Sequence, residues 1–240
     1  MSRNRVLQVE FRSDTVHRLT DISASKEPDL LAVFPFPRKL EISDTIGCMM
    51  PTVSRARLSL LNPPQNKPNK DPILVALMWA RGPDKHDALL KKWCIYKKKL
   101  ADLQGDVIPI CHGLFTALYG DVRISCLVLE WCIPFLTIYD DGLSQTRLEA
   151  VRKLHARGIC HGALQDRRNF RVGSDGKIRI IGFGKATEHK CPNAIPSKSV
   201  DRIGRICQEL DEFESSYYMP GTICDFTGFC ESRCSSYPHV

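Results

Sequence analysis

One short segment, residues 154–186, restricts the folds open to this chain more than any other part of it. A helical pattern of apolar residues stops at Gly158, which favours a helix end there. Two short apolar runs follow, at 170–172 and 178–181, and the Ser-Asp-Gly sequence at 174–176 between them is typical of a hairpin turn. The segment therefore predicts a helix that leads through a polar loop into a β-hairpin.

The remaining hydrophobic patterns predict strands first and helices later. Strands are expected where short apolar or alternating runs are bounded by turn residues, and helices where apolar residues recur every three or four positions. The predicted strands are two within 40–61 around a turn at Gly47, then 73–79, 107–110, 113–119 and 124–129; the predicted helices are 86–103, 145–157 and about 199–213. This order predicts an α+β fold with two lobes joined near residue 131.

Composition divides the chain into three regions: a polar leader at 1–39 with one edge strand around Val9 and Phe11, a domain at 40–213, and a Cys-rich tail at 214–240. The two lobes of the domain are placed at about 40–130 and 131–213. Hydrophobic residues make up 43% of the chain and charged residues 25%, as in an ordinary globular protein.

The N-terminal sequence has no apolar run of the kind found in signal peptides. The most apolar stretch, 124–139, is interrupted by Glu130 and is too short to cross a bilayer. We therefore expect an intracellular protein, cytoplasmic or nuclear, without membrane association.

The net charge of +7 is concentrated in one predicted helix. Its basic residues are Lys91, Lys92, Lys97, Lys98 and Lys99. A solvated helix face explains such a run, and an anionic partner is the alternative. No helix-turn-helix, zinc-finger or RNA-binding signature accompanies it, so nucleic acid is an unlikely partner.

The eleven cysteines are scattered along the chain. In a reducing compartment most of them are expected to be small buried hydrophobic residues. The tail contains Cys224, Cys230, Cys234 and His239, but their spacing is not the paired C-x-x-C spacing of zinc sites. The sequence therefore predicts no metal site.

The segment at 154–186 resembles the catalytic core of protein kinases. The resemblance is carried by the helix end, by His161-Gly162, by Asn169, by the hairpin and by Phe183-Gly184. Two further matches, Leu-Gln-Gly at 103–105 and His-Lys-Cys-Pro at 189–192, resemble the short kinase-like proteins abundant in mushroom-forming fungi. The resemblance covers about residues 40–213, and it implies a two-lobed protein-kinase-like fold with a small strand-rich N-lobe and a truncated helical C-lobe. The alternative is the same helix, loop and hairpin in an unrelated fold.

The positions that carry charge in a working kinase are changed here. Phosphoryl transfer needs a carboxylate that orients the attacking hydroxyl, a carboxylate on the metal, and a strand Lys held by a helix Glu. The matching positions hold Ala163, Gly182, Met78 and, on the helix, Lys92, with Cys94 as the other candidate there. None of these side chains can do the work of the residue it replaces. The resemblance therefore implies that no catalytic residue functions at these positions.

Three polar residues of the loop are retained as candidates: Asn169, Asp166 and His161. Asn169 resembles a second metal ligand, although Arg168 competes for that position; Asp166 is the only nearby carboxylate, and His161 can brace the loop. A weakened adenine site is the second expectation. Its candidate residues are Gly47 in the degraded glycine-rich loop, Ala76 on the strand that carries Met78, and Glu130 and Cys132 at the lobe junction. Ala76 and Met78 should share one strand face because side chains alternate along a strand.

The sequence thus predicts a catalytically inactive pseudokinase that acts by binding an unknown protein partner, and it predicts neither ATP nor magnesium as a cofactor. One alternative is an atypical or weakly active ATP-dependent kinase, for which ATP and magnesium would be required. The other is a basic nucleic-acid-binding or other interaction protein.

Overall fold

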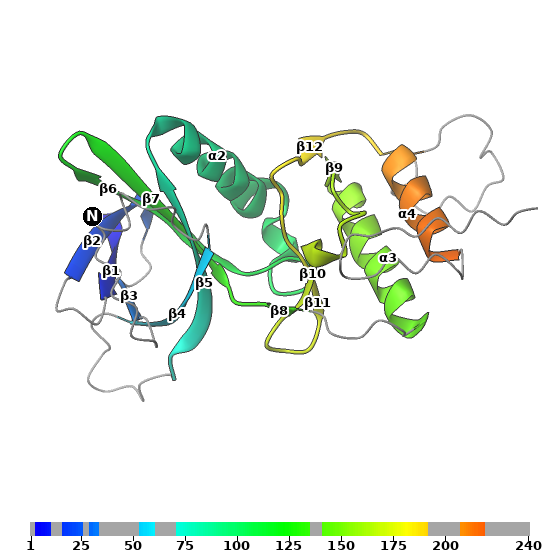
Figure 1. Cartoon of the computed structure of the whole chain (residues 1–240), viewed down its shortest axis with the longest axis horizontal. Coiled ribbons are helices and arrows are strands. Elements are labelled where there is room, and N and C mark those ends of the chain that lie inside the picture. Colours follow the sequence, from blue (N-terminus) through cyan, green and yellow to red (C-terminus); the bar gives the residue numbers. More distant parts are fainter. Residues whose placement is uncertain are drawn as a thin grey trace, which may run out of the picture.

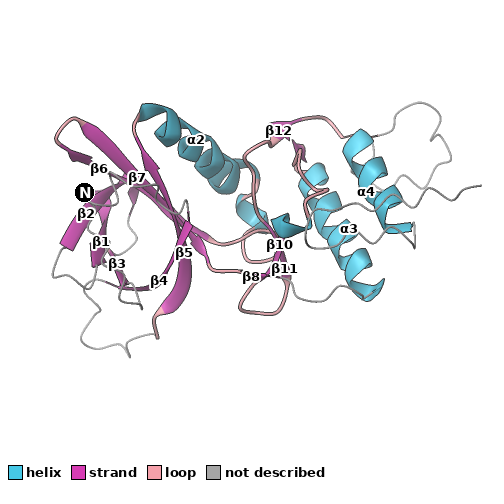
Figure 2. Ribbon diagram, viewed as in Figure 1, coloured by secondary structure: helices cyan, strands magenta, loops and turns pink. Residues whose placement is uncertain are grey.

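The computed structural model describes residues 3–10, 16–25, 29–33, 53–60, 71–134, 141–191 and 207–218. A β-barrel forms one end of the molecule, two helices form the other, and a β-hairpin lies between them (Figures 1 and 2). Gly47, the rest of the predicted glycine-rich loop at 46–52, and the predicted loop at 62–70 lie outside the described residues.

Seven strands close into a barrel. Their order around it is β1, β2, β6, β7, β5, β4 and β3, and the parallel pairing of β1 with β3 closes the ring. The strands are β1 (Arg3–Glu10), β2 (Val16–Ser25), β3 (Leu30–Val33), β4 (Val53–Leu60), β5 (Ile73–Arg81), β6 (Cys111–Tyr119) and β7 (Val122–Glu130).

Every second side chain of the strands points inward, and these side chains fill the barrel. On β5, Val75 and Leu77 are fully buried in a core that they share with Leu7 of β1 and Phe115 of β6. On β7, Val128 belongs to the same core, whereas its neighbours along the strand face outward. Inward and outward residues alternate because successive side chains of a strand point to opposite faces.

A second core lies outside the barrel, between its β5–β7 face and the helices. It contains residues of helix α2 (Pro83–Cys94), of the π-helical turn Ile95–Lys99, and of helices α3 (Asp141–Ala156) and α4 (Gln208–Tyr218). The remaining short elements are the 3₁₀ turns Ala101–Leu103 and Arg167–Asn169 and the strands β8 (Ile133–Pro134), β9 (Ile159–Cys160), β10 (Phe170–Val172), β11 (Ile178–Ile180) and β12 (Thr187–Glu188).

The predicted fold class is wrong. The described part of the chain is mostly β, with a closed seven-stranded barrel and three short α-helices, and it is not a two-lobed kinase-like fold with a helical C-lobe. The difference begins at the N-terminus, where residues predicted as a polar leader supply strands β1, β2 and β3. Without these strands the other four would form an open sheet.

The leader was misjudged because its strands carry a buried ion pair. Arg5 is 4% exposed and Asp21 is 2% exposed, and the Arg5 Nη2 atom lies 2.9 Å from the Asp21 Oδ2 atom. Charged residues are rarely buried unless they are paired. A sequence pattern therefore treats them as surface residues, so only the edge strand around Val9 was recognised, and neither the full length of β1 nor any of β2 was predicted.

Several predicted elements are confirmed with small shifts. Strand 73–79 is β5, the helix at 145–157 is α3, and the hairpin is β10 and β11. The helix predicted at 86–103 starts earlier and changes to a π-helical turn after Cys94. Residues 107–110 do not form a strand. Of the last predicted helix, about 199–213, residues 199–206 lie outside the described residues, and α4 covers 208–213 and continues to 218. Among the described helices, none combines the length and apolarity needed to cross a membrane.

Candidate functional site

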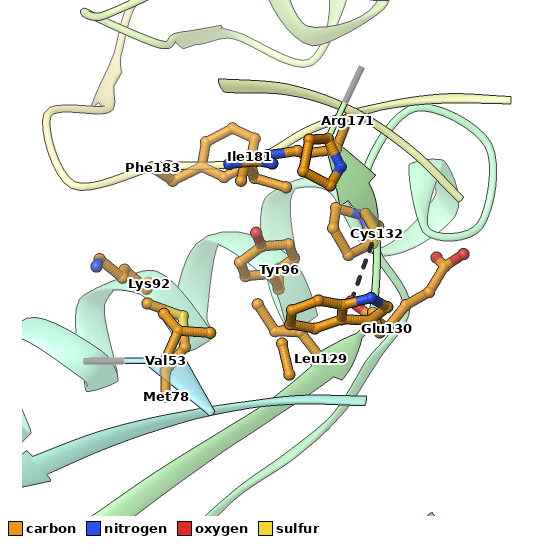
Figure 3. Close-up of a pocket in the computed structure, with 15 residues that line it drawn as sticks. Val53, Met78, Lys92, Tyr96, Leu129, Glu130, Cys132, Arg171, Ile181 and Phe183 are labelled. Carbon is orange, nitrogen blue, oxygen red and sulfur yellow. Dashed lines mark hydrogen bonds between the residues drawn. The ribbon is translucent and has the colours of Figure 1, made fainter. Parts of the chain in front are cut away.

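A cleft of about 410 Å³ lies between the outer face of the barrel and the chain that follows the hairpin (Figure 3). The barrel side is made by β4, β5 and β7, and the opposite side by residues 181–183. Most of the lining is apolar; its main contributors are Val53, Ala76, Met78, Leu129, Ile181 and Phe183.

The barrel wall of the cleft follows from strand alternation on β5. Val75 and Leu77 point into the barrel. Ala76 and Met78 alternate with them along the strand and therefore face the cleft outside the barrel. The prediction that Ala76 and Met78 share one face is therefore confirmed. Phe183, on the other side, is 3% exposed and packs edge to face on Tyr96, with ring centroids 5.4 Å apart.

Lys92 lies at the Met78 end of the cleft (Figure 3). It is half-buried, and this burial lowers the pKa of its ammonium group below the ordinary value for lysine. No ion pair to Lys92 is found within the described ranges. Arg171 lies towards the opposite end (Figure 3). The apolar slot thus has a cation near each end.

The short segment between β7 and β8 also lines the cleft. Cys132 is part of the lining, its Sγ atom lies 3.8 Å from the carbonyl oxygen of Glu130, and burial raises its thiol pKa to about 12. Trp131 completes this segment, and its amide donates to the carbonyl of Leu74 over 3.2 Å. The thiol is therefore protonated at neutral pH and is a poor nucleophile.

The Glu130 carboxylate is committed to a buried ion pair. Its Oε2 atom accepts from Nε of Arg179 over 3.1 Å and from the Ile110 amide over 3.2 Å. Arg179 is 2% exposed and also lies 3.0 Å from Asp175. This pair connects the end of β7 to the β10–β11 hairpin. Glu130 therefore fixes the shape of the cleft and is not a free acid in it.

The polar loop after β9 packs beside the cleft. The side chain of Asn169 donates from Nδ2 to the carbonyl of Ala163 over 2.8 Å. The backbone carbonyl of Asn169 accepts from the Ile181 amide over 2.8 Å. A Cβ atom at Gly182 would collide with Oδ1 of Asn169, and Gly182 has a positive φ of 87°. The Asn169 side chain thus occupies the space that a side chain at 182 would need.

Two other loop residues have structural partners. Asp166 holds Arg168 through both carboxylate oxygens, at 2.9 Å to Nε and 2.9 Å to Nη2, and this hydrogen bonding lowers the Asp166 pKa. His161 is fully buried, donates from Nε2 to the Ile181 carbonyl over 2.7 Å and packs on Phe183. Its role as a brace of the loop is therefore consistent with the structure.

The structure brings six of the predicted site residues into one cleft: Ala76, Met78, Lys92, Glu130, Cys132 and Gly182. Four others, His161, Ala163, Asp166 and Asn169, do not line it, and Gly47 lies outside the described residues. Sequence reasoning missed Tyr96 and Arg171 as lining residues, whereas Trp131 lies within the predicted stretch from Glu130 to Cys132. Only Tyr96 left a signal, since it belongs to the apolar stripe of the predicted helix.

No family model matches this chain, and no curated protein shows detectable sequence similarity to it. The resemblance to protein kinases stays a prediction from the sequence, and the fold that this resemblance implied is wrong.

Proposed function

We propose that this protein acts by binding, and that its cleft holds a small molecule with a flat, apolar body without transferring a phosphoryl group. The observation that carries the proposal is the apolar slot between Ala76 and Met78 on one side and Ile181 and Phe183 on the other. Its volume of about 410 Å³ lies in the range of small-molecule sites. Flat apolar ligands suit such a slot because both of their faces lose contact with water.

The polar groups around the slot favour binding over phosphoryl transfer. Charge on a transferring phosphoryl group must be neutralised by metal ions, and magnesium prefers carboxylate oxygens. Glu130, the carboxylate that lines the cleft, is paired with Arg179, and Asp166 is paired with Arg168. Met78 and Gly182 bring no charge to the slot, which leaves Lys92 as the cation at that end.

Adenosine is a suitable probe because it is flat, uncharged and of the right size. A ligand at ten times its Kd stabilises the native state by about 1.4 kcal/mol, which corresponds to a rise in Tm of roughly 3–6 °C for a chain of this size. We expect adenosine to raise Tm in this way. Ala76→Phe, which fills the slot, should abolish the rise.

Ala101→Phe is the matched control, because residue 101 is exposed and lies outside the cleft. It adds the same side chain and should leave the adenosine effect unchanged. A wild-type protein that shows no shift at millimolar adenosine, or an Ala76→Phe protein that shifts like the wild type, would contradict binding in this slot.

The protein partner expected from the sequence stays a prediction, and so does the expectation that nucleic acid is not bound. Exposed apolar side chains near the segment after β7 favour a protein partner. Ile73 is 48% exposed, Leu74 44%, Ile110 43% and Ile133 52%. The backbone amide of Trp131 donates to the carbonyl of Leu74, and the backbone amide of Glu130 donates to the carbonyl of Ile110. The segment after β7 is therefore bonded to both of these exposed apolar stretches.

A further inference from the structure

Four side chains that can ligate a metal converge beside the C-terminal end of α3, away from the cleft. They are His155, His189, Cys191 and Cys207, and their ligand atoms all lie within 4.8 Å of one another. Nε2 of His189 is 3.0 Å from Nδ1 of His155, and Sγ of Cys207 is 3.4 Å from the same atom. His155 and Cys207 are buried and the other two are half-buried.

These separations suit a tetrahedral zinc ion. With Zn–N bonds of about 2.0–2.1 Å and Zn–S bonds of about 2.3 Å, ligand atoms around the metal are separated by about 3.3–3.8 Å. The separations from His155 Nδ1 to His189 and to Cys207 are close to this range, and the upper limit of 4.8 Å for all pairs exceeds it by about 1 Å. Two imidazoles and two thiols are also a ligand set that zinc uses in closed structural sites.

A carboxylate behind His155 orients the ring for this role. Nε2 of His155 donates to Oε2 of Glu209 over 2.8 Å, which leaves Nδ1 as the lone-pair nitrogen that faces the other three side chains. Glu209 is itself held by the backbone amides of His161, at 2.8 Å, and Gly162. Metal-bound histidines commonly carry such a carboxylate partner on their second ring nitrogen.

The backbone brings the ligands together from three separate segments. His155 lies in the last turn of α3, His189 and Cys191 follow β12, and Cys207 immediately precedes α4. Gly158 has a φ of 72°, and its carbonyl accepts from the His189 amide over 2.9 Å. The chain therefore turns back at Gly158 and places His189 beside His155, with ring centroids 4.8 Å apart.

We propose that His155, His189, Cys191 and Cys207 bind one zinc ion in a closed, structural site that fixes α4 against α3. This differs from the sequence-based prediction of no metal site. Spacing rules missed the cluster because its only close pair, His189 and Cys191, is two residues apart and the other ligands are far away in the sequence. A metal-free hydrogen-bond network among the same four side chains is the competing account.

Zinc content tests the proposal directly. The full chain, purified without chelator from zinc-supplemented cells, should contain about one zinc per chain. X-ray absorption of that protein should show two sulfur ligands at about 2.3 Å and two nitrogen ligands at about 2.0–2.1 Å. Cobalt added to the chelator-treated protein should give the intense visible bands of a tetrahedral thiolate site. The last two measurements use the unmodified chain and do not depend on whether a variant folds.

Variants then assign the ion to this cluster. Cys207→Ser and His189→Ala should each lower the zinc content at least tenfold, whereas Cys94→Ser, a half-buried cysteine outside the cluster, should retain about one zinc per chain. A triple Ser variant at Cys224, Cys230 and Cys234 should also retain it. Protein with less than about a tenth of a zinc per chain and no thiolate–cobalt bands would overturn the proposal. So would stoichiometric zinc that survives Cys207→Ser or that is lost in the triple tail variant.

Discussion

Arg179→Met should lower the free energy of unfolding by about 3–5 kcal/mol, because it leaves a buried carboxylate without its partner. Arg179 is 2% exposed and Glu130 is 9% exposed, with 3.1 Å between Nε and Oε2. Nη1 of Arg179 also donates to the Asp106 carbonyl over 2.9 Å. Methionine preserves much of the volume but none of these bonds. Urea unfolding of both proteins measures the difference.

Arg168→Met is the matched control, since the Arg168 side chain is 84% exposed in its pair with Asp166. Exposed ion pairs contribute little, so this control should change stability by less than about 0.5 kcal/mol. Adding Glu130→Leu to Arg179→Met should restore much of the loss, because the unpaired charge is then removed. A loss of under about 1 kcal/mol for Arg179→Met would show that the pair does not hold the hairpin.

Gly182→Asp should destabilise the protein by roughly 2–5 kcal/mol. The left-handed backbone conformation costs a residue with a side chain about 1–2 kcal/mol, and displacing a packed neighbour costs about 1–3 kcal/mol more. The neighbour is Asn169, whose Oδ1 occupies the position that the new Cβ needs. Urea unfolding again provides the measurement. Introducing an acidic residue at 182 therefore does not by itself create a metal-binding position.

Gly176→Asp separates the two costs. Gly176 has a similar φ of 79°, but nothing lies within 4 Å of its added Cβ. Its loss should be limited to the backbone cost of about 1–2 kcal/mol. Asn169→Ala combined with Gly182→Asp should recover part of the difference by making space. Equal losses for Gly182→Asp and Gly176→Asp would contradict the collision with Asn169.

Local elements of the fold were predictable, and the closure of the barrel was not. Strand β5, helix α3 and the β10–β11 hairpin follow from periodicity and turn residues that lie within the elements themselves. Barrel closure depends on β1 and β2, of which only an edge strand around Val9 was predicted, because the buried Arg5–Asp21 pair looks like two surface charges. Such a pair is recognisable only when residues sixteen positions apart are known to be neighbours.

The candidate site also has a part that local sequence predicted and a part that depends on long-range contacts. Strand alternation predicted that Ala76 and Met78 share a face, and the structure places both in the cleft. Alternation could not show that Arg179 would hold Glu130, because that contact spans 49 residues. It also could not place Asn169 against Gly182, since their contact depends on how the loop packs beside the hairpin. Long-range packing decided which polar groups remain open to a ligand.

Calorimetric titration of the wild-type protein with adenosine and with ATP, each with and without magnesium, tests the proposed binding function most directly. The cleft offers apolar walls and no open carboxylate among its described lining residues. Adenosine should therefore bind, and ATP should bind with a Kd within about tenfold of it, a difference of at most about 1.4 kcal/mol. Magnesium should leave both values unchanged. Tightening of ATP binding by more than about tenfold on adding magnesium, or binding of magnesium-ATP without any binding of adenosine, would contradict this account.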